Sequence, residues 1–180
     1  MNFPSKLIED AVKAFSQLPG IGKKTALRLV LHLLKQSPEM VTNFGDTITK
    51  MRHDIKFCKT CHNISDHEEC SICANPKRDR QLVCVVETIR DVIAIENTNQ
   101  FRGTFHVLGG VISPIDGIGP DNLNLVSLEE RVKNDKVKEL IMALNPTMEG
   151  DTTVFYISKK LKETGVTVTL WLEGFLLVGN

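Results

Sequence analysis

The chain has 180 residues, of which 42% are apolar and 24% are charged, with 22 basic and 22 acidic side chains. This composition is ordinary for a globular protein and excludes a disordered chain. No run approaches the ~20 consecutive apolar residues that a transmembrane helix needs, and the first residues lack the layout of a signal peptide. We therefore expect a cytoplasmic protein.

Charge is distributed unevenly along the chain. Residues 1–57 hold nine Lys/Arg and five Asp/Glu, whereas residues 81–180 hold nine Lys/Arg and thirteen Asp/Glu. The basic N-terminal part suits a partner that carries phosphates, and the acidic C-terminal part suits metal ions or basic protein surfaces.

Residues 1–56 are predicted to form a helical domain. Apolar residues recur at helical spacing over 5–17, over 23–36 and from Pro38 to about residue 56, and Ser5 stands where the first helix needs an N-cap. The third helix carries an apolar face made of Val41, Phe44, Ile48, Met51 and Ile55.

A short glycine-containing segment, Leu18-Pro19-Gly20-Ile21-Gly22, separates the first two helices. Gly20 and Gly22 permit positive φ and let a phosphate approach the backbone. Lys23, Lys24 and Arg28 add cations near the positive N-terminal end of the next helix. We predict a helix-hairpin-helix motif that binds the DNA backbone without reading sequence. The alternative is a glycine turn between core helices with solvated lysines.

Residues 57–80 are predicted to form a zinc segment. Cys58, Cys61, Cys70 and Cys73 stand in two Cys-x2-Cys pairs, a pattern that provides four thiolates for one tetrahedral Zn²⁺ per chain. Four sulfur ligands leave no coordination position for water, so the ion is expected to be structural. His62 or His67 could replace one cysteine. The run 77–80 is expected to be a solvated surface or a DNA contact.

Residues 81–180 alternate between strand and helix patterns. Strands are predicted over 82–86, 105–108, 139–144 and 166–172, and helices over 89–96, 127–133 and 151–162. This alternation indicates an α/β domain with a mostly parallel, Rossmann-like sheet. Cys84 lies in the first of these strands and is expected to be buried and inert.

Three carboxylates follow strands of this predicted sheet. Glu87 comes after the first strand, and Glu149 and Asp151 come after the third. Ligand sites of α/β sheets form at the carboxyl ends of strands, and Mg²⁺ prefers oxygen ligands, so these residues could bind Mg²⁺. Acidic residues after strands are also common without a metal.

The order of hairpin, four-cysteine segment and α/β domain resembles the RecR family of bacterial recombination proteins. The hairpin with Lys24 and Arg28 matches the family's helix-hairpin-helix, and the four cysteines followed by Arg78-Asp79 match its zinc segment. The strings that match its Toprim domain are Val85-Val86-Glu87, His106-Val107-Leu108-Gly109-Gly110, Ser113-Pro114 and Gly117-Ile118-Gly119-Pro120.

The resemblance implies a Toprim fold without topoisomerase or primase activity, in a ring-like homotetramer that encircles DNA. It also implies that the chain works with RecO and RecF and helps load RecA onto strands coated by single-stranded-DNA-binding protein. Lys24 and Arg28 then become DNA contacts. Glu87, Glu149 and Asp151 become an acidic cluster for partner docking or metal-assisted contact.

The end of the chain, residues 170–180, departs from the family pattern. We hypothesise a frame error in the coding DNA and expect an exposed apolar tail, which puts C-terminal subunit contacts in doubt. Two other functions stay open. One is a Mg²⁺-dependent Toprim nuclease or topoisomerase, although the only tyrosine, Tyr156, is predicted to lie mid-helix in the core. The other is a zinc-stabilised interaction protein without a DNA role.

Overall fold

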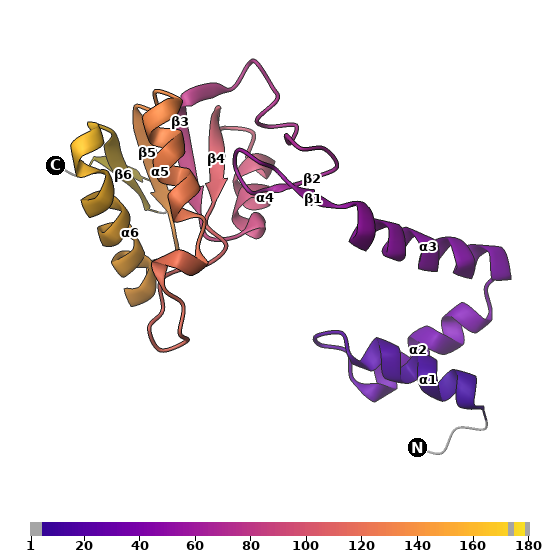
Figure 1. The fold of residues 1–180 in the computed structure, drawn as a ribbon. Coiled ribbons are helices and arrows are strands. Elements are labelled where there is room, and N and C mark those ends of the chain that lie inside the picture. Colours follow the sequence, from indigo (N-terminus) through magenta and orange to yellow (C-terminus); the bar gives the residue numbers. More distant parts are fainter. Residues whose placement is uncertain (1–4, 173–174, 179–180) are drawn as a thin grey trace. The chain divides into compact units, whose positions relative to one another are not determined.

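The computed structural model describes residues 5–172 and 175–178, and the chain divides into two compact units, Met1–Asp54 and Ile55–Asn180 (Figure 1). Within the described residues, no helix combines the length and the apolar character needed to span a membrane.

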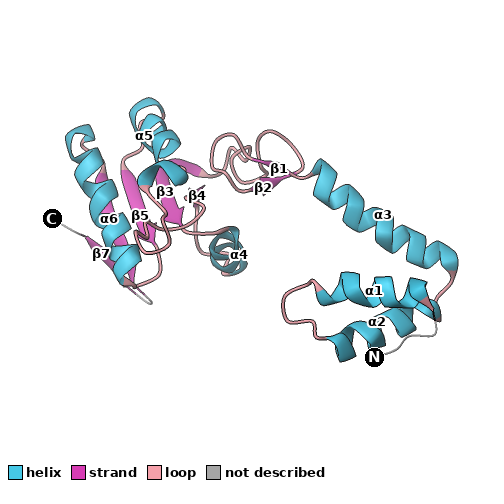
Figure 2. Cartoon of the chain, turned by 60° about the horizontal axis from the view of Figure 1, so that its bottom comes forward, coloured by secondary structure: helices cyan, strands magenta, loops and turns pink. Residues whose placement is uncertain are grey.

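The first unit consists of three helices, α1 (Lys6–Ser16), α2 (Lys23–Leu34) and α3 (Pro38–Asp54) (Figure 2). Its core is small because, among the residues from Ser5 onward that the structure describes in this unit, only Val12, Ala26 and Val30 are buried, with partly buried apolar side chains around them. The three predicted helices are confirmed.

Two details of this unit differ from the sequence prediction. Ser5 occupies the N-cap position of α1 with extended backbone, but its side chain makes no capping hydrogen bond. The apolar face of α3 exists, yet no described residue of α3 is buried, and Phe44, Ile48 and Met51 are 45–54% exposed. The predicted helix is therefore confirmed, but its apolar face does not belong to the core of this unit.

The second unit begins with a two-stranded antiparallel hairpin, β1 (Lys56–Phe57) and β2 (Ile64–Ser65). An α/β domain follows. Its elements are β3 (Asp79–Val86), α4 (Ile89–Asn97), β4 (Gly103–Val107), the 3₁₀ turn η1 (Pro120–Asn122), α5 (Leu125–Asn134), β5 (Glu139–Ala143), α6 (Met148–Leu161), the 3₁₀ turn η2 (Lys162–Thr164), β6 (Thr167–Leu172) and β7 (Phe175–Val178).

The sheet has the order β4-β3-β5-β6-β7, in which the first four strands are parallel and β7 is antiparallel to β6. The predicted mostly parallel sheet is confirmed. Sequence analysis missed β7, which lies in the departing segment 170–180. Of the expected exposed apolar tail, Leu170 and Trp171 are 38% and 36% exposed. The side chains of residues 172–180 lie outside the described part of the structure, as does the backbone of residues 173–174 and 179–180.

Alternating residues of the central strand β3 face two different cores. Val83 and Val85 pack with α5 and α6 on one side of the sheet, whereas Cys84 and Val86 pack with Val92 of α4 on the other. Because both faces are covered at the second half of β3, residues 82–86 form a continuous apolar run. Cys84 is buried as predicted, and burial raises the pKa of its thiol to about 12.

Candidate functional site: a zinc centre and a nucleic-acid interface

The four cysteines of the second unit converge on one point. All four are buried, and their Sγ atoms lie within 4.8 Å of one another. A tetrahedral Zn²⁺ with Zn–S distances of ~2.3 Å separates its sulfurs by ~3.8 Å, so the spacing fits this ion with little movement. Neither His62 nor His67 belongs to the group, which favours the four-cysteine set over a set containing histidine.

Backbone amides surround the sulfurs. Cys70 N–H lies 3.3 Å from Cys58 Sγ, and Cys73 N–H lies 3.5 Å from Cys70 Sγ. Hydrogen bonds from the Cys61 and Cys73 side chains, together with backbone amides, hold the pKa of the Cys70 thiol well below its usual range. The same side-chain contacts raise the pKa of the Cys61 and Cys73 thiols, so they favour the metal-binding thiolate form at Cys70 alone.

The loop that contains the first cysteine pair, Cys58 and Cys61, is joined directly to the five-stranded sheet. Val107 N–H at the end of β4 donates to the Cys61 carbonyl at 2.8 Å. The next residue, His62, has a φ of 60° and lies 2.7 Å from the Ser127 hydroxyl through Nε2. The zinc centre therefore fixes the position of β4 and α5 as well as its own loops.

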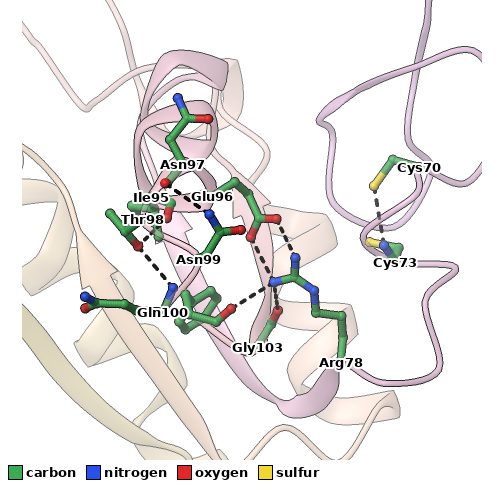
Figure 3. A network of polar contacts seen from close by, with 11 residues as sticks. Cys70, Cys73, Arg78, Ile95, Glu96, Asn97, Thr98, Asn99, Gln100 and Gly103 are labelled. Atoms are coloured by element: carbon green, nitrogen blue, oxygen red, sulfur yellow. Dashed lines mark hydrogen bonds and ion pairs between the residues drawn. The ribbon is translucent and has the colours of Figure 1, made fainter.

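A second connection runs from the end of the zinc segment to α4 (Figure 3). The Arg78 guanidinium donates to both carboxylate oxygens of Glu96 and also to the carbonyls of Phe101 and Gly103. Its side chain is only 17% exposed. The predicted solvated surface at 77–80 is therefore wrong for Arg78, because this side chain pairs with a helix that comes later in the chain.

The hairpin of the first unit leaves its backbone open. Gly20 has a φ of 77°, whereas Gly22 is extended and forms the N-cap of α2, so only Gly20 needs positive φ. A Cβ at either position would meet nothing within 4 Å. The backbone at both glycines is thus accessible to an anion at the positive end of α2.

The cations that follow this hairpin are exposed. Lys23, Lys24 and Arg28 all lie on α2, and no ion pair joins them to a carboxylate within the described parts of the chain. In contrast, Lys6 and Lys13 of α1 pair with acidic residues of their own helix. The positive charge of α2 is therefore free to bind an external anion.

The three predicted carboxylates lie at or near the carboxyl end of the sheet. Glu87 follows β3 and accepts a hydrogen bond of 2.9 Å from the Asn145 side chain, while Glu149 and Asp151 occupy the first turn of α6. Among the described residues, only the four cysteines form a group of three or more ligand atoms at metal-binding distance. A role of the carboxylates with Mg²⁺ or a partner stays a prediction.

Sequence reasoning missed two buried polar side chains. Arg131 of α5 donates to the Phe105 carbonyl at 2.6 Å and to the Thr104 hydroxyl at 2.7 Å. His106 of β4 donates from Nε2 to the Asn124 carbonyl at 2.8 Å, and burial lowers its pKa to about 3. The one available signal was the position of Arg131, three residues after Leu128 on the apolar face of its helix.

Three domain families match consecutive parts of the chain. Residues 8–52 match the RecR helix-hairpin-helix, residues 55–75 match the RecR four-cysteine zinc finger domain, and residues 81–171 match the Toprim domain. The predicted fold class and the zinc site are thereby confirmed.

Relatives are similar over nearly the whole chain. The Recombination protein RecR of Cytophaga hutchinsonii is 58% identical over 100% of this chain and 88% of its own length. The proteins of the same name from Bacteroides fragilis and Flavobacterium psychrophilum are 58% and 60% identical, over 96% and 97% of this chain and 84% of their own lengths.

Proposed function

The chain belongs to the RecR family of recombination proteins, and from that membership we propose that it is a DNA-binding mediator of recombinational repair. In this role it works with RecO and RecF and helps RecA load onto single strands coated by single-stranded-DNA-binding protein. It does so in the cytoplasm, at the nucleoid during repair, as a ring-like homotetramer without catalysis of its own.

The observation that carries the proposal is the exposed hairpin and its unneutralised cations. Open backbone at Gly20 and Gly22, the N-terminal end of α2, and the side chains of Lys23, Lys24 and Arg28 together provide donors and positive charge for phosphates. Contacts to phosphates carry no sequence information, so binding is expected to be independent of sequence.

We assign different roles to three segments. Residues 1–56 contact DNA, residues 57–80 hold the zinc centre, and residues 81–180 form the Toprim domain that meets protein partners. Cys58, Cys61, Cys70 and Cys73 would hold Zn²⁺, which supplies a rigid crosslink between loops too short to form a core. Glu87, Glu149 and Asp151 are assigned to docking of a basic partner surface.

The test is DNA binding across a salt series by wild type and by Lys24→Ala/Arg28→Ala, with the mass in solution recorded for both. Affinity should fall steeply with salt, and the double variant should lose most of it. Salt-independent binding, or a double variant that binds as well as wild type, would favour the zinc-stabilised interaction protein.

The absence of catalysis is tested separately. Tyr156, the candidate nucleophile of a topoisomerase, is partly buried against the core beneath α6, which supports a packing role. We expect no nicking, relaxation or cleavage of plasmid DNA with Mg²⁺ at millimolar concentration. Cleavage that disappears in Glu87→Gln would establish the enzymatic alternative.

A further inference from the structure

A shallow groove runs along the outer face of α2. It has a volume of about 480 Å³ and is lined by Lys24, Leu27, Arg28, Leu31, His32 and Lys35. All of these side chains are exposed except Leu27, which is partly buried. The groove begins at Lys24, in the first turn of α2, and continues to Lys35, the C-cap residue of this helix.

The stretch of sequence that forms this groove contains no acidic residue. From Ala11 to Pro38 the sequence contains no Asp or Glu, although it contains several cations. Lys35, like Lys24 and Arg28, makes no ion pair within the part of the chain that the structure describes. Within this stretch, the basic side chains that begin at the hairpin therefore continue beyond the first turn of the helix without an ion-pair partner in the described structure.

The spacing of the basic side chains matches a repeating anion. Lys24, Arg28 and His32 are four residues apart, and Lys35 follows three residues later. A helix rises 1.5 Å per residue, so neighbouring members of this row are separated by about 4.5–6 Å along the axis. A row of this kind can meet consecutive phosphates of one strand, while Leu27 and Leu31 support the aliphatic stems of the long side chains.

Lys35, at the C-terminal end of α2, distinguishes a strand that follows the whole helix from one that is bound only at the hairpin. The C-terminal end of a helix is the negative end of its dipole and would repel a phosphate. Lys35 stands at this end and offsets the repulsion, so its removal should matter to a strand that reaches this far. A ligand held only at the hairpin would be nearly indifferent to Lys35.

We propose that the phosphodiester backbone of DNA lies along the whole length of α2, so that Lys35 binds phosphate in addition to the hairpin and its adjacent cations. This inference rests on the proposed function. It enlarges the contact beyond Gly20, Gly22, Lys23, Lys24 and Arg28 and adds at least one neutralised phosphate per bound subunit.

The experiment compares wild type with Lys35→Ala by fluorescence anisotropy on a labelled oligonucleotide, in single-stranded and duplex forms, between 50 and 300 mM salt. Loss of one phosphate contact should reduce the slope of log affinity against log salt by about 0.7 for single strands and about 0.9 for duplex. At 0.1 M salt, affinity should fall about fivefold and about eightfold, respectively.

Two matched variants separate charge at this site from other effects. Lys13→Ala removes the same charge from α1, where the ammonium lies 2.6 Å from Glu9, and should leave the slope unchanged. Lys35→Arg keeps the charge and should bind like wild type. Helix content by circular dichroism should agree among all four proteins.

The possible results distinguish this inference from the function on which it rests. If Lys24→Ala/Arg28→Ala loses binding while Lys35→Ala retains both slope and affinity, DNA stops at the hairpin and the inference fails alone. If both variants bind like wild type, the proposed DNA role fails as well. A loss shared equally by Lys13→Ala would also overturn the inference, since it would reflect overall charge.

Discussion

The Arg78 guanidinium connects the zinc segment to α4, and its removal should destabilise the second unit. In Arg78→Met the stem is kept, but the hydrogen bonds to Glu96, Phe101 and Gly103 are lost. A hydrogen bond to a charged group contributes about 1.5–3 kcal/mol. Because the two charged side chains are 17% and 27% exposed, water replaces part of the interaction, and we expect a loss of about 2 kcal/mol.

The single tryptophan provides the assay. Trp171 lies in β6 with its ring centroid 6.4 Å from that of Phe101, so its fluorescence reports on the unit that Arg78 stabilises. Urea unfolding followed by this signal should show a lower midpoint with an unchanged slope. The corresponding decrease in melting temperature is about 4–8 °C for a chain of this size.

Arg90→Met is the matched control, because Arg90 lies on α4 as Glu96 does, is exposed, and makes no ion pair among the described residues. Its stability should stay within about 0.5 kcal/mol of wild type. The reasoning is refuted if Arg78→Met unfolds at the same urea concentration as Arg90→Met. It is supported further if Glu96→Gln adds little destabilisation once Arg78 is absent.

Three further perturbations test other parts of the structure. Gly150→Ala should cost at least about 2 kcal/mol, because its Cβ would lie 2.1 Å from a backbone oxygen, whereas Gly45→Ala in α3 has open space and should stabilise by about 0.5–1 kcal/mol. Burial lowers the pKa of His106 from 6.5 to about 3, so between these pH values the unfolded chain binds a proton that the folded chain does not. The free energy of unfolding should therefore be highest above pH 6.5 and should fall by up to about 1.4 kcal/mol per pH unit as the pH decreases toward 3. Cys70→Ser should reduce the zinc content measured by atomic absorption from one ion per chain and lower the unfolding midpoint of the second unit.

Each of these tests has a contradicting result. Urea unfolding measures the stability of both glycine variants. Equal stabilities of Gly150→Ala and Gly45→Ala would exclude a close approach between the backbone at Gly150 and the neighbouring carbonyl oxygen. An acid dependence that stays as steep in His106→Gln would assign it to other groups, including the zinc ligands. Full zinc content in Cys70→Ser would mean that this sulfur is not required for binding.

Structural features that depend on residues close together in the chain were predictable from the sequence. The three helices of the first unit, the parallel strands and the zinc ligands each depend on spacing between residues that are near in the chain. The exposure of α3 was not predictable, because helical periodicity shows that apolar residues share a face and does not show what covers it. Arg78 looked like part of a charged run because its partner, Glu96, is eighteen residues away.

The same limit applies to the buried polar residues. His106 and Arg131 satisfy backbone and side-chain oxygens that become neighbours only after the sheet has formed. At the hairpin, both glycines were identified correctly as sites without obstructing side chains, but only the structure assigns positive φ to Gly20 and the N-cap to Gly22. The sequence thus located the hairpin, whereas the fold determines which of its two glycines has positive φ and which one forms the N-cap.

The position of β4 gives the zinc centre a significance beyond local stability. β4 is the outermost strand on its side of the sheet, and such a strand can recruit a strand of another chain through unpaired backbone groups. Here the Val107 amide donates a hydrogen bond to the Cys61 carbonyl, and the Arg131 guanidinium donates one to the Phe105 carbonyl. Loss of the metal should release the Cys58–Cys61 loop and leave the Val107 amide unpaired, so zinc depletion should promote intermolecular strand pairing at this end of β4 and aggregation.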